Sequence, residues 1–377
     1  MKVLLVSISF YPEVSPRSFR ATELAKELSR QGISVEVAGV DLTSEEDSLR
    51  KEFLSQHRIN WQSLGKADWS ILAKKWQEKG GIFRLLAKAM GYFLEFPSIE
   101  WYFKLPKILR IAEDTTALIS IAKPFSVHWG INRLKAKGSL KGICWIADCG
   151  DPFMLSTLNV RKIPFYFSFL EKSFCRSCDF LVTPVTDGYR GYYPEFKNKI
   201  KVIPQGFNFK EDRKKVGDYI ENQQLTFVYA GSFLHKGRNP EVLLKYLSNS
   251  TLNFRFYIYT QQKYLVEPHI VKGDLRFQVM DIISRDEMLK TLGSADFVIN
   301  MMNGTMVQVP SKLIDYFIVD RPVLNIENDQ LNGGELSIID EFLCGNYINR
   351  YQFTGMDRYD ISFVVKDFLQ LIESKNE

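Results

Sequence analysis

Residues 2–40 read KVLLVSISFYPEVSPRSFRATELAKELSRQGISVEVAGV, and this stretch decides the fold class. It opens with a continuous apolar run over residues 2–10, which is typical of a strand buried in a parallel sheet. After a loop with two prolines, apolar residues recur at helical spacing until Gly32, a favoured residue just past a helix end. A second apolar run follows at residues 33–40. The order strand, loop, helix, strand predicts the start of a doubly wound α/β domain.

The same pattern restarts in the second half of the chain. LTFVYAGSF at residues 225–233 reads as a strand, NPEVLLKYLSN at residues 239–249 as a helix, and NFRFYIYT at residues 253–260 as a strand. Strand and helix patterns then alternate through RPVLNI, which ends at residue 326. The polar residues 208–224 read as a linker. We therefore predict two Rossmann-like doubly wound domains, at residues 1–207 and 208–355, that face a central cleft.

The composition fits an ordinary soluble enzyme-sized protein. Of the 377 residues, 45% are apolar and 25% are charged, and the net charge of +5 is too mild to predict a nucleic-acid partner. Five cysteines are few, and Cys175-x-x-Cys178 has no second pair or nearby histidine, so no metal site is expected. The start does not resemble a signal peptide, and no apolar run reaches the roughly 18 residues of a membrane span. We expect a cytoplasmic protein.

Residues 66–110 combine basic and aromatic side chains. They hold nine Lys/Arg against four Asp/Glu, a surplus equal to that of the whole chain, together with nine aromatic residues. Basic residues interleaved with aromatic ones suit an anionic membrane surface, which predicts peripheral contact with the inner leaflet. The apolar spacing equally fits amphipathic helices packed on a domain, and both interpretations stay open.

Ligands of doubly wound folds bind at the carboxyl ends of the strands, so the loops that follow strands carry the candidate residues. Two such loops lie in the C-terminal half, SFLHKGR at residues 232–238 and NGTMVQVPSK at residues 303–312. Their cations can neutralise phosphate, their small residues let the backbone approach a ligand, and helix N-termini add N–H donors. The candidates for binding a nucleotide donor are Ser232, Lys236, Arg238, Gly304, Thr305 and Lys312.

Asp315 follows Lys312 by one helical turn. An acid near a helix start can merely complement the helix dipole. It can also accept two hydrogen bonds from the vicinal hydroxyls of a ribose. We favour the second role, because the neighbouring loops carry the cations that a nucleotide phosphate needs.

The N-terminal half offers Asp148 and Asp151 at the end of another predicted strand, within IADCGDPF. Two acids three residues apart can serve an acceptor hydroxyl, as can His128 acting as a base. A single histidine is as often a structural residue. Arg17 and Arg20 in the first loop region complete the acceptor-side candidates.

Six segments in order resemble the bacterial glycosyltransferases of the GT-B fold, in the family-4-like group and its polysaccharide-assembly subset. The resemblance covers almost the whole chain. It is carried by FYPEVSPRSFRATELAKELSRQGISVEV, FPSIEWYFKLPKI, KPFSVHWGINRLKAKGSLKGICWIADCGDPF, LEKSFCRSCDFLVTPVTDGY with KIKVIPQGFN, FVYAGSFLHKGRNPEVLL and VPSKLIDYFIVDRPVL.

This resemblance implies transfer of a sugar from a nucleoside diphosphate sugar, with retention, to a glycan or lipid-linked acceptor in bacterial surface polysaccharide synthesis. No metal or other cofactor is implied. Lys236 would contact the donor diphosphate, Asp315 the ribose, and residues 304–307 the donor sugar. Asp148 and Asp151 would line the acceptor side. The helix at residues 356–377 would cross back to the N-terminal domain.

The chain departs from the family pattern at three positions. Ser232 replaces an arginine, Val307 replaces a glutamate that touches the donor sugar in many members, and Gly150 replaces an arginine of the subset. A GT-B protein without turnover, acting as a binding or scaffolding partner in polysaccharide assembly, is therefore the alternative. A nucleotide-sugar epimerase of this architecture is disfavoured because its histidine and Glu/Arg set is not found. A Rossmann oxidoreductase is disfavoured because no G-x-G-x-x-G follows the first strand.

Overall fold

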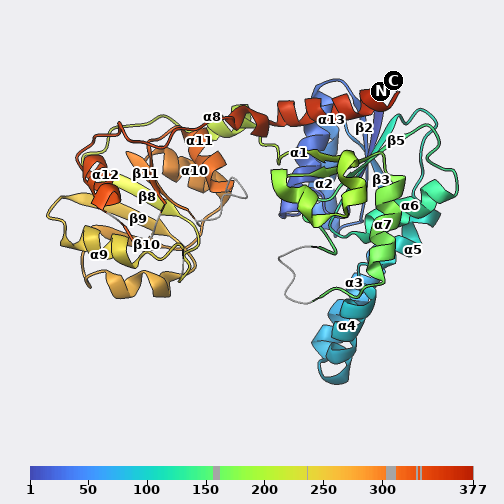
Figure 1. Cartoon of the computed structure of the whole chain (residues 1–377), viewed down its shortest axis with the longest axis horizontal. Coiled ribbons are helices and arrows are strands. Elements are labelled where there is room, and N and C mark those ends of the chain that lie inside the picture. Colours follow the sequence, from blue (N-terminus) through green and yellow to red (C-terminus); the bar gives the residue numbers. More distant parts are fainter. Residues whose placement is uncertain (156–161, 236, 303–310, 328–329, 332, 377) are drawn as a thin grey trace. The chain divides into compact units, whose positions relative to one another are not determined.

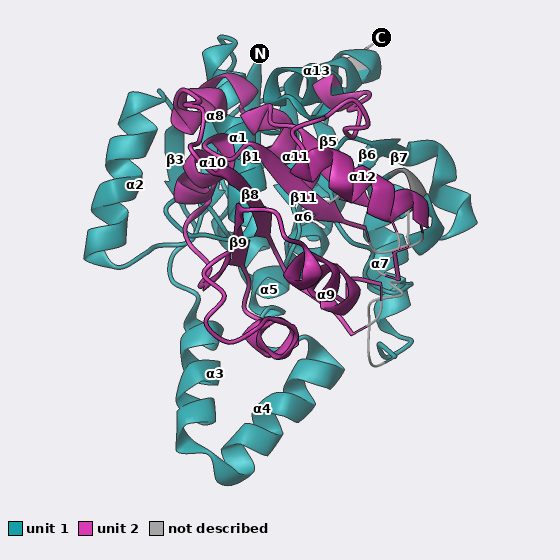
Figure 2. Ribbon diagram, turned by 90° about the vertical axis from the view of Figure 1, so that its left-hand side faces the viewer, with its two compact units in different colours: residues 1–207, 358–377 teal, residues 208–357 magenta. Residues whose placement is uncertain are grey.

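The computed structural model describes the chain except for residues 156–161, 236, 303–310, 328–329, 332 and 377. The chain forms two compact units, drawn in different colours in Figure 2. Unit 1 comprises residues 1–207 and 358–377, and unit 2 comprises residues 208–357. Each unit holds a parallel sheet flanked by helices, so the predicted α/β class is confirmed.

The regular elements of unit 1 alternate between strand and helix for most of their length (Figure 1). In chain order they are β1 (Lys2–Val6), α1 (Pro16–Arg30), β2 (Ser34–Gly39), α2 (Ser44–Gln56), β3 (Asn60–Ser63), α3 (Asp68–Lys79), α4 (Gly81–Leu94), α5 (Glu100–Ile108), β4 (Ala117–Ile121), α6 (Ser126–Ala136), β5 (Cys144–Asp148), α7 (Phe167–Ser177), β6 (Phe180–Thr183), β7 (Ile200–Val202) and α13 (Ile361–Asn376).

The described strands of unit 1 form one sheet in the order β3-β2-β1-β4-β5-β6-β7, with every neighbouring pair parallel. Because side chains alternate along a strand, β1 contributes residues to the hydrophobic cores on both faces of the sheet. Val3 and Leu5 pack with α1 and α13 on one face. Leu4 and Val6 pack with α5, α6 and α7 on the other face. Burial on both faces explains why the sequence of β1 is a continuous apolar run.

The last helix, α13, belongs to unit 1 although unit 2 precedes it in the chain. Backbone bonds between Phe207 and the segment just before α13 fix its start, with Phe207 N donating to Tyr359 O at 2.8 Å and Ile361 N to Phe207 O at 2.9 Å. Gly206 suits this point, because a Cβ there would lie 2.4 Å from Cδ1 and 3.1 Å from Cα of Ile361. The PQGF motif at residues 204–207 therefore serves the docking of the terminal helix.

Unit 2 repeats the same winding on a smaller scale. Its elements are α8 (Phe209–Val216), β8 (Leu225–Ala230), α9 (Glu241–Asn249), β9 (Phe254–Tyr259), β10 (Phe277–Met280), α10 (Arg285–Gly293), β11 (Phe297–Met301), α11 (Ser311–Val319), β12 (Val323–Ile326) and α12 (Gly333–Leu343). The described strands pair in the parallel order β10-β9-β8-β11-β12. Stacked rings of Phe227, Phe256 and Phe297 fill the centre of its core, with centroid distances of 4.6 Å and 4.5 Å to Phe227.

Residues 66–110 do not behave as one surface. Trp101 and Leu105 of α5 are buried in the core beside α6, whereas α4 has no buried residue at all. The interpretation as a packed amphipathic helix is therefore confirmed for α5, and membrane contact through this segment stays a prediction. In Figure 1, α3 and α4 extend away from the sheet of unit 1. Within the described residues, no helix combines the length and apolar character needed to cross a bilayer.

Candidate functional site

The sheet of unit 2 has its topological switch point between β8 and β11, since β9 continues the winding on one side and β12 on the other. In doubly wound folds the crevice at the carboxyl ends of these two strands is where ligands bind. Gly231 directly follows β8, and α11 follows β11 after the loop. Residues from these two connections build the candidate site.

Lys312, in the first turn of α11, reaches across to the end of β8. Its Nζ lies so close to Gly231 that a Cβ built on that glycine would be 1.3 Å away. The same ammonium lies 5.0 Å from the centre of the Tyr229 ring. The absence of a side chain at Gly231 therefore makes room for the Lys312 ammonium, which any side chain there would displace.

Arg238 lies close enough to Lys312 for its charge to act on it. Its Nη1 donates to the carbonyl oxygen of Ser232 at 3.4 Å, and the hydroxyl of Tyr229 donates to the same oxygen at 3.0 Å. Burial, and to a lesser extent the positive charge of Arg238, lower the pKa of Lys312 to about 8. Two partly buried cations close to each other at strand ends form a site suited to an anion.

Asp315 lies one turn further into α11 and is held by Arg285 from the start of α10. Nε and Nη2 of Arg285 donate to the same oxygen of Asp315, Oδ1, at 3.0 Å and 2.8 Å. The remaining arm of Arg285 donates to Asp212 at 3.0 Å. Burial raises the pKa of Asp315, while Arg285 opposes that rise. Because both bonds use Oδ1, this arrangement fixes the carboxylate and leaves Oδ2 outside that pair.

The described part of the chain includes four of the seven predicted donor-binding residues. Ser232, Arg238, Lys312 and Asp315 are described, and Ser232 is exposed. Lys236, Gly304 and Thr305 lie outside the described residues, as does Val307. Arg285 was missed in the sequence, because an arginine thirty residues before Asp315 carries no local signal of the pairing.

Arg20 and Asp148 in unit 1 do not line a surface as predicted. Both are buried, and Nε of Arg20 donates to Oδ2 of Asp148 at 2.7 Å. The other nitrogens of Arg20 donate to the carbonyl oxygens of Ile203, at 3.2 Å, and Pro204, and its guanidinium lies 5.4 Å from the Phe368 ring centre. The pair therefore links α1 and β5 with α13 and with the segment at residues 203–204. This is a correction to their expected acceptor-side roles.

His128 is fully buried on α6, so the structural alternative fits it better than the role of a base. Its Nδ1 lies 2.8 Å from the hydroxyl of Ser120, which also accepts from Nε1 of Trp145 at 2.8 Å. Its Nε2 lies 3.7 Å from Sγ of Cys149. Burial lowers the pKa of His128 to about 3, so its ring is neutral at ordinary pH. The sequence alone does not reveal this burial.

Arg17 and Asp151 remain at the surface near the carboxyl end of β5. Arg17 packs over Gly150, where a Cβ would lie 1.8 Å from Nη2 of Arg17 and where φ is +63°. Asp151 is 4.0 Å from Arg17 and 3.9 Å from Lys123, a cation that the sequence did not single out. With 39% of its side chain exposed, Asp151 is the candidate acid that a ligand could reach.

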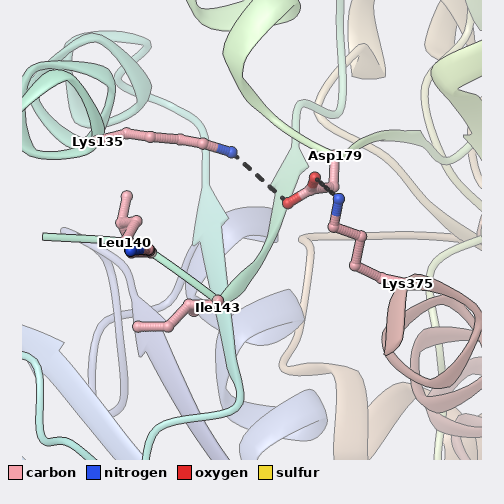
Figure 3. A pocket seen from close by; sticks show the side chains of 7 residues that line it. Lys135, Leu140, Ile143, Asp179 and Lys375 are labelled. Carbon is pink, nitrogen blue, oxygen red and sulfur yellow. Dashed lines mark ion pairs between the residues drawn. The ribbon is translucent and has the colours of Figure 1, made fainter. Parts of the chain in front are cut away.

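A separate hollow of about 360 Å³ in unit 1 lies at the opposite edge of the sheet, beside the start of β5. Figure 3 shows Lys135 and Lys375 both directed at Asp179, with distances of 3.7 Å and 3.0 Å. Asp179 also accepts from the backbone N of Trp145 at 2.9 Å. These contacts fasten the end of α13 to unit 1, and the hollow lies away from the strand ends where ligands bind. Among the described residues, no group of three or more acids, histidines or cysteines could hold a metal ion.

No protein family model matches this chain, and no curated protein matches it. Comparison with solved structures finds whole-length matches at low identity. A glycosyltransferase from Rickettsia africae is 13% identical, with a TM-score of 0.61, over 99% of this chain and 98% of the other. TarM of S. aureus, solved with fondaparinux, alpha-GlcNAc-glycerol and UDP, is 9% identical, with a TM-score of 0.57, over 98% and 99%. The lipopolysaccharide outer core galactosyltransferase WaaB is 10% identical, with a TM-score of 0.56, over all of both chains.

These matches show that the chain has the GT-B fold, which confirms the fold predicted from the resemblance. They show the fold alone. A UDP-GlcNAc 2-epimerase from Methanocaldococcus jannaschii also matches, at 10% identity and a TM-score of 0.53 over 99% of each chain. The activity must therefore be argued from the residues of the site.

Proposed function

We propose that this protein is a glycosyltransferase that uses a nucleoside diphosphate sugar as donor. The observation that carries the proposal is the pair of cations, Lys312 and Arg238, at the switch point of unit 2, where Lys312 packs against the bare backbone of Gly231. A diphosphate is the ligand that suits such a pair of cations, and the N-terminus of α11 adds further N–H donors. Asp315, one turn along the same helix, accepts hydrogen bonds from the ribose hydroxyls.

In this mechanism the cations act on the leaving group. When the bond to the sugar breaks, negative charge develops on the nucleoside diphosphate, and fixed positive groups stabilise it more strongly than the uncleaved donor. Lys312 and Arg238 supply that charge, so the reaction needs no metal ion. Retention of configuration is the expected outcome. For an inverting reaction, Asp151 is the base that remains accessible, since Asp148 and His128 are buried.

The acceptor is a glycan or a lipid-linked oligosaccharide in the assembly of a bacterial surface polysaccharide such as capsule, O-antigen or exopolysaccharide. The order of motifs supports this context, as does the fold shared with a lipopolysaccharide galactosyltransferase. Arg17 and Asp151 are the acceptor-side candidates at the surface of unit 1. Such a protein works in the cytoplasm, on the inner face of the membrane.

Binding of a nucleoside diphosphate is expected to weaken as the pH rises through about 8. The folded protein holds Lys312 at a pKa of about 8, below its ordinary 10.5, so the ammonium is present below that pH and lost above it. A bound diphosphate favours the charged form, so binding above this pH takes up a proton, and affinity falls by up to about tenfold per pH unit. Calorimetry at several pH values measures both effects.

The Lys312→Met variant should bind the nucleoside diphosphate weakly, and its affinity should depend little on pH between about pH 7 and about pH 9. Lys290→Met is the control, because Lys290 is an exposed lysine on α10 of the same unit. A wild-type affinity that is unchanged across this pH range would contradict the assignment of Lys312 to the diphosphate.

Asp315→Asn is expected to weaken nucleotide binding by about 10- to 100-fold, because hydrogen bonds to a charged acceptor contribute about 1.5–3 kcal/mol. The loss should be much smaller for the corresponding 2′,3′-dideoxynucleotide, which lacks the ribose hydroxyls. Asp218→Asn, at an exposed acid of unit 2, should change neither affinity. Equal losses for the two nucleotides would show that Asp315 acts only through Arg285 and the fold.

A scaffolding protein without turnover is the second candidate, favoured by the burial of Asp148 and by exposed Ser232 in place of an arginine. The test offers nucleoside diphosphate sugars with and without glycan acceptors and measures the nucleoside diphosphate released. Release that depends on the acceptor and is lost in Lys312→Ala supports transfer. Binding without release supports the scaffold, and conversion of the donor sugar without an acceptor supports an epimerase.

A further inference from the structure

Helix α4 of unit 1 is amphipathic yet packs little of its apolar face. Its sequence, GIFRLLAKAMGYFL, contains no acid, and none of its residues is buried. The side chains of Ile82 and Leu85 are 76% and 67% exposed, and Leu86, Phe93 and Leu94 are exposed as well. Phe83 lies toward α3, with its ring centre 6.4 Å from that of Trp76. Scattered apolar residues are normal on a surface, but a whole helix face of them marks an interaction site.

A second apolar group adjoins the C-terminal end of α4. Phe165, just before α7, is 77% exposed, and Phe169 in its first turn is exposed too. The hydroxyl of Tyr92 on α4 donates to the carbonyl oxygen of Lys162 at 2.9 Å, and the hydroxyl of Tyr166 donates to that of Phe93. These bonds join the two groups into one apolar surface, the α4–α7 surface, which consists of Ile82, Leu85, Leu86, Phe93, Leu94, Phe165 and Phe169.

Exposed basic side chains border this surface. Arg84 and Lys88 lie four residues apart on α4 and so share one side of it, away from Ile82 and Phe93. Helix α3 adds exposed Lys74, Lys75 and Lys79, so residues 68–94 carry five basic residues against two acids. A helix with an apolar face of Leu, Ile and Phe and a basic polar face is typical of binding in the plane of a membrane interface.

We propose that the α4–α7 surface docks unit 1 on an anionic lipid membrane. The basic residues match the negative surface of the lipid, and the apolar side chains insert at the boundary of headgroups and acyl chains. A second copy of this chain fits less well, because a symmetric contact would bring Arg84 and Lys88 against their own copies. The inference is independent of sugar transfer, since it needs no nucleotide. If both hold, unit 1 presents its acceptor-side residues while attached to the membrane that carries a lipid-linked acceptor.

The test is co-sedimentation of the full chain, without nucleotide, with vesicles of phosphatidylcholine alone or mixed with phosphatidylglycerol. The wild type is expected to bind the anionic vesicles preferentially, and high salt should reduce that binding. Arg84→Gln combined with Lys88→Gln should lower partitioning roughly 25-fold, since each cation near an anionic surface contributes about fivefold. Ile82→Ser combined with Leu85→Ser should lower it by about tenfold or more on the same vesicles.

Matched control variants distinguish binding through this surface from nonspecific binding by exposed apolar or basic residues elsewhere. Leu275→Ser with Ile348→Ser removes two apolar side chains that are 82% and 81% exposed on unit 2. Lys137→Gln with Lys141→Gln removes two exposed cations of unit 1 outside the α3–α4 region. Both controls should bind vesicles as the wild type does, and all variants replace exposed residues, so folding is preserved.

Three results would overturn the proposal. One is a wild type that shows no preference for anionic vesicles. Another is undiminished binding by both α4 variants. The third is a dimer in light scattering that Ile82→Ser with Leu85→Ser converts to a monomer, which would assign the surface to a second copy. If the protein binds vesicles but transfers no sugar, the proposed activity is contradicted and the membrane site is still supported.

Discussion

Replacing Lys312 by alanine is expected to lower kcat/KM for sugar transfer by about 100- to 1,000-fold, the usual effect of removing one preorganised group that stabilises developing negative charge. Lys312 is fixed against Gly231 and Tyr229 and is half-buried, so water cannot easily replace it. Its charge matters most when the nucleoside diphosphate leaves. The loss should therefore appear in kcat as well as in KM, and steady-state measurement of nucleotide release separates the two.

Two further variants make this prediction specific. Lys290→Ala removes an exposed lysine of unit 2 and should leave kcat/KM unchanged. Gly231→Ala keeps the lysine but places a methyl group where its ammonium lies, so it should lose activity as Lys312→Ala does. Activity within a few-fold of wild type in Lys312→Ala would rule out the assigned role of this residue.

Arg20→Met is expected to lower the free energy of unfolding of unit 1 by about 3–5 kcal/mol, because it leaves the buried carboxylate of Asp148 without its cation. The same change removes the bonds to the carbonyl oxygens of Ile203 and Pro204. Denaturant unfolding with a signal from unit 1 measures the effect. Lys51→Ala, which removes a surface pair with Asp47, should cost less than about 1 kcal/mol.

The double variant Arg20→Met with Asp148→Leu tests whether Asp148 is structural. Replacing a buried ion pair by apolar residues of similar size is often neutral, so most of the lost stability should return. Sugar transfer should return with it, since Asp148 is not the accessible acid. A stable double variant that has lost all sugar transfer would contradict the structural role and assign Asp148 to catalysis.

Most of the fold could be predicted from sequence because periodicity reports burial directly. The apolar run of β1 and the helical spacing of α1 each carry a local signal, and their order predicts the doubly wound sheet. Gly206 lies in a segment that resembles the family pattern. The physical reason for a glycine there is its contact with Ile361, which lies 155 residues later in the chain and so gives no local signal. Local patterns thus give the elements, whereas contacts distant in sequence give the reasons for single residues.

The candidate site was harder to predict because residue type does not reveal burial. Lys312 and Arg238 were identified from their loops, and the structure brings them together. Asp148, as a polar residue at a strand end, shared the pattern of Asp151, yet the structure buries the first with Arg20 and exposes the second. Likewise α4 and α5 share one basic aromatic composition, but only α5 is packed into the core.

The central claim is that unit 2 binds a nucleoside diphosphate at the ends of β8 and β11. Calorimetric titration of the wild type and of Lys312→Ala with UDP, GDP, ADP, TDP and CMP tests it most directly. We predict that one of the diphosphates binds the wild type, that CMP does not, and that Lys312→Ala weakens the binding by about tenfold or more. If no nucleotide binds, or if one binds both proteins equally, unit 2 is not a donor site of this kind.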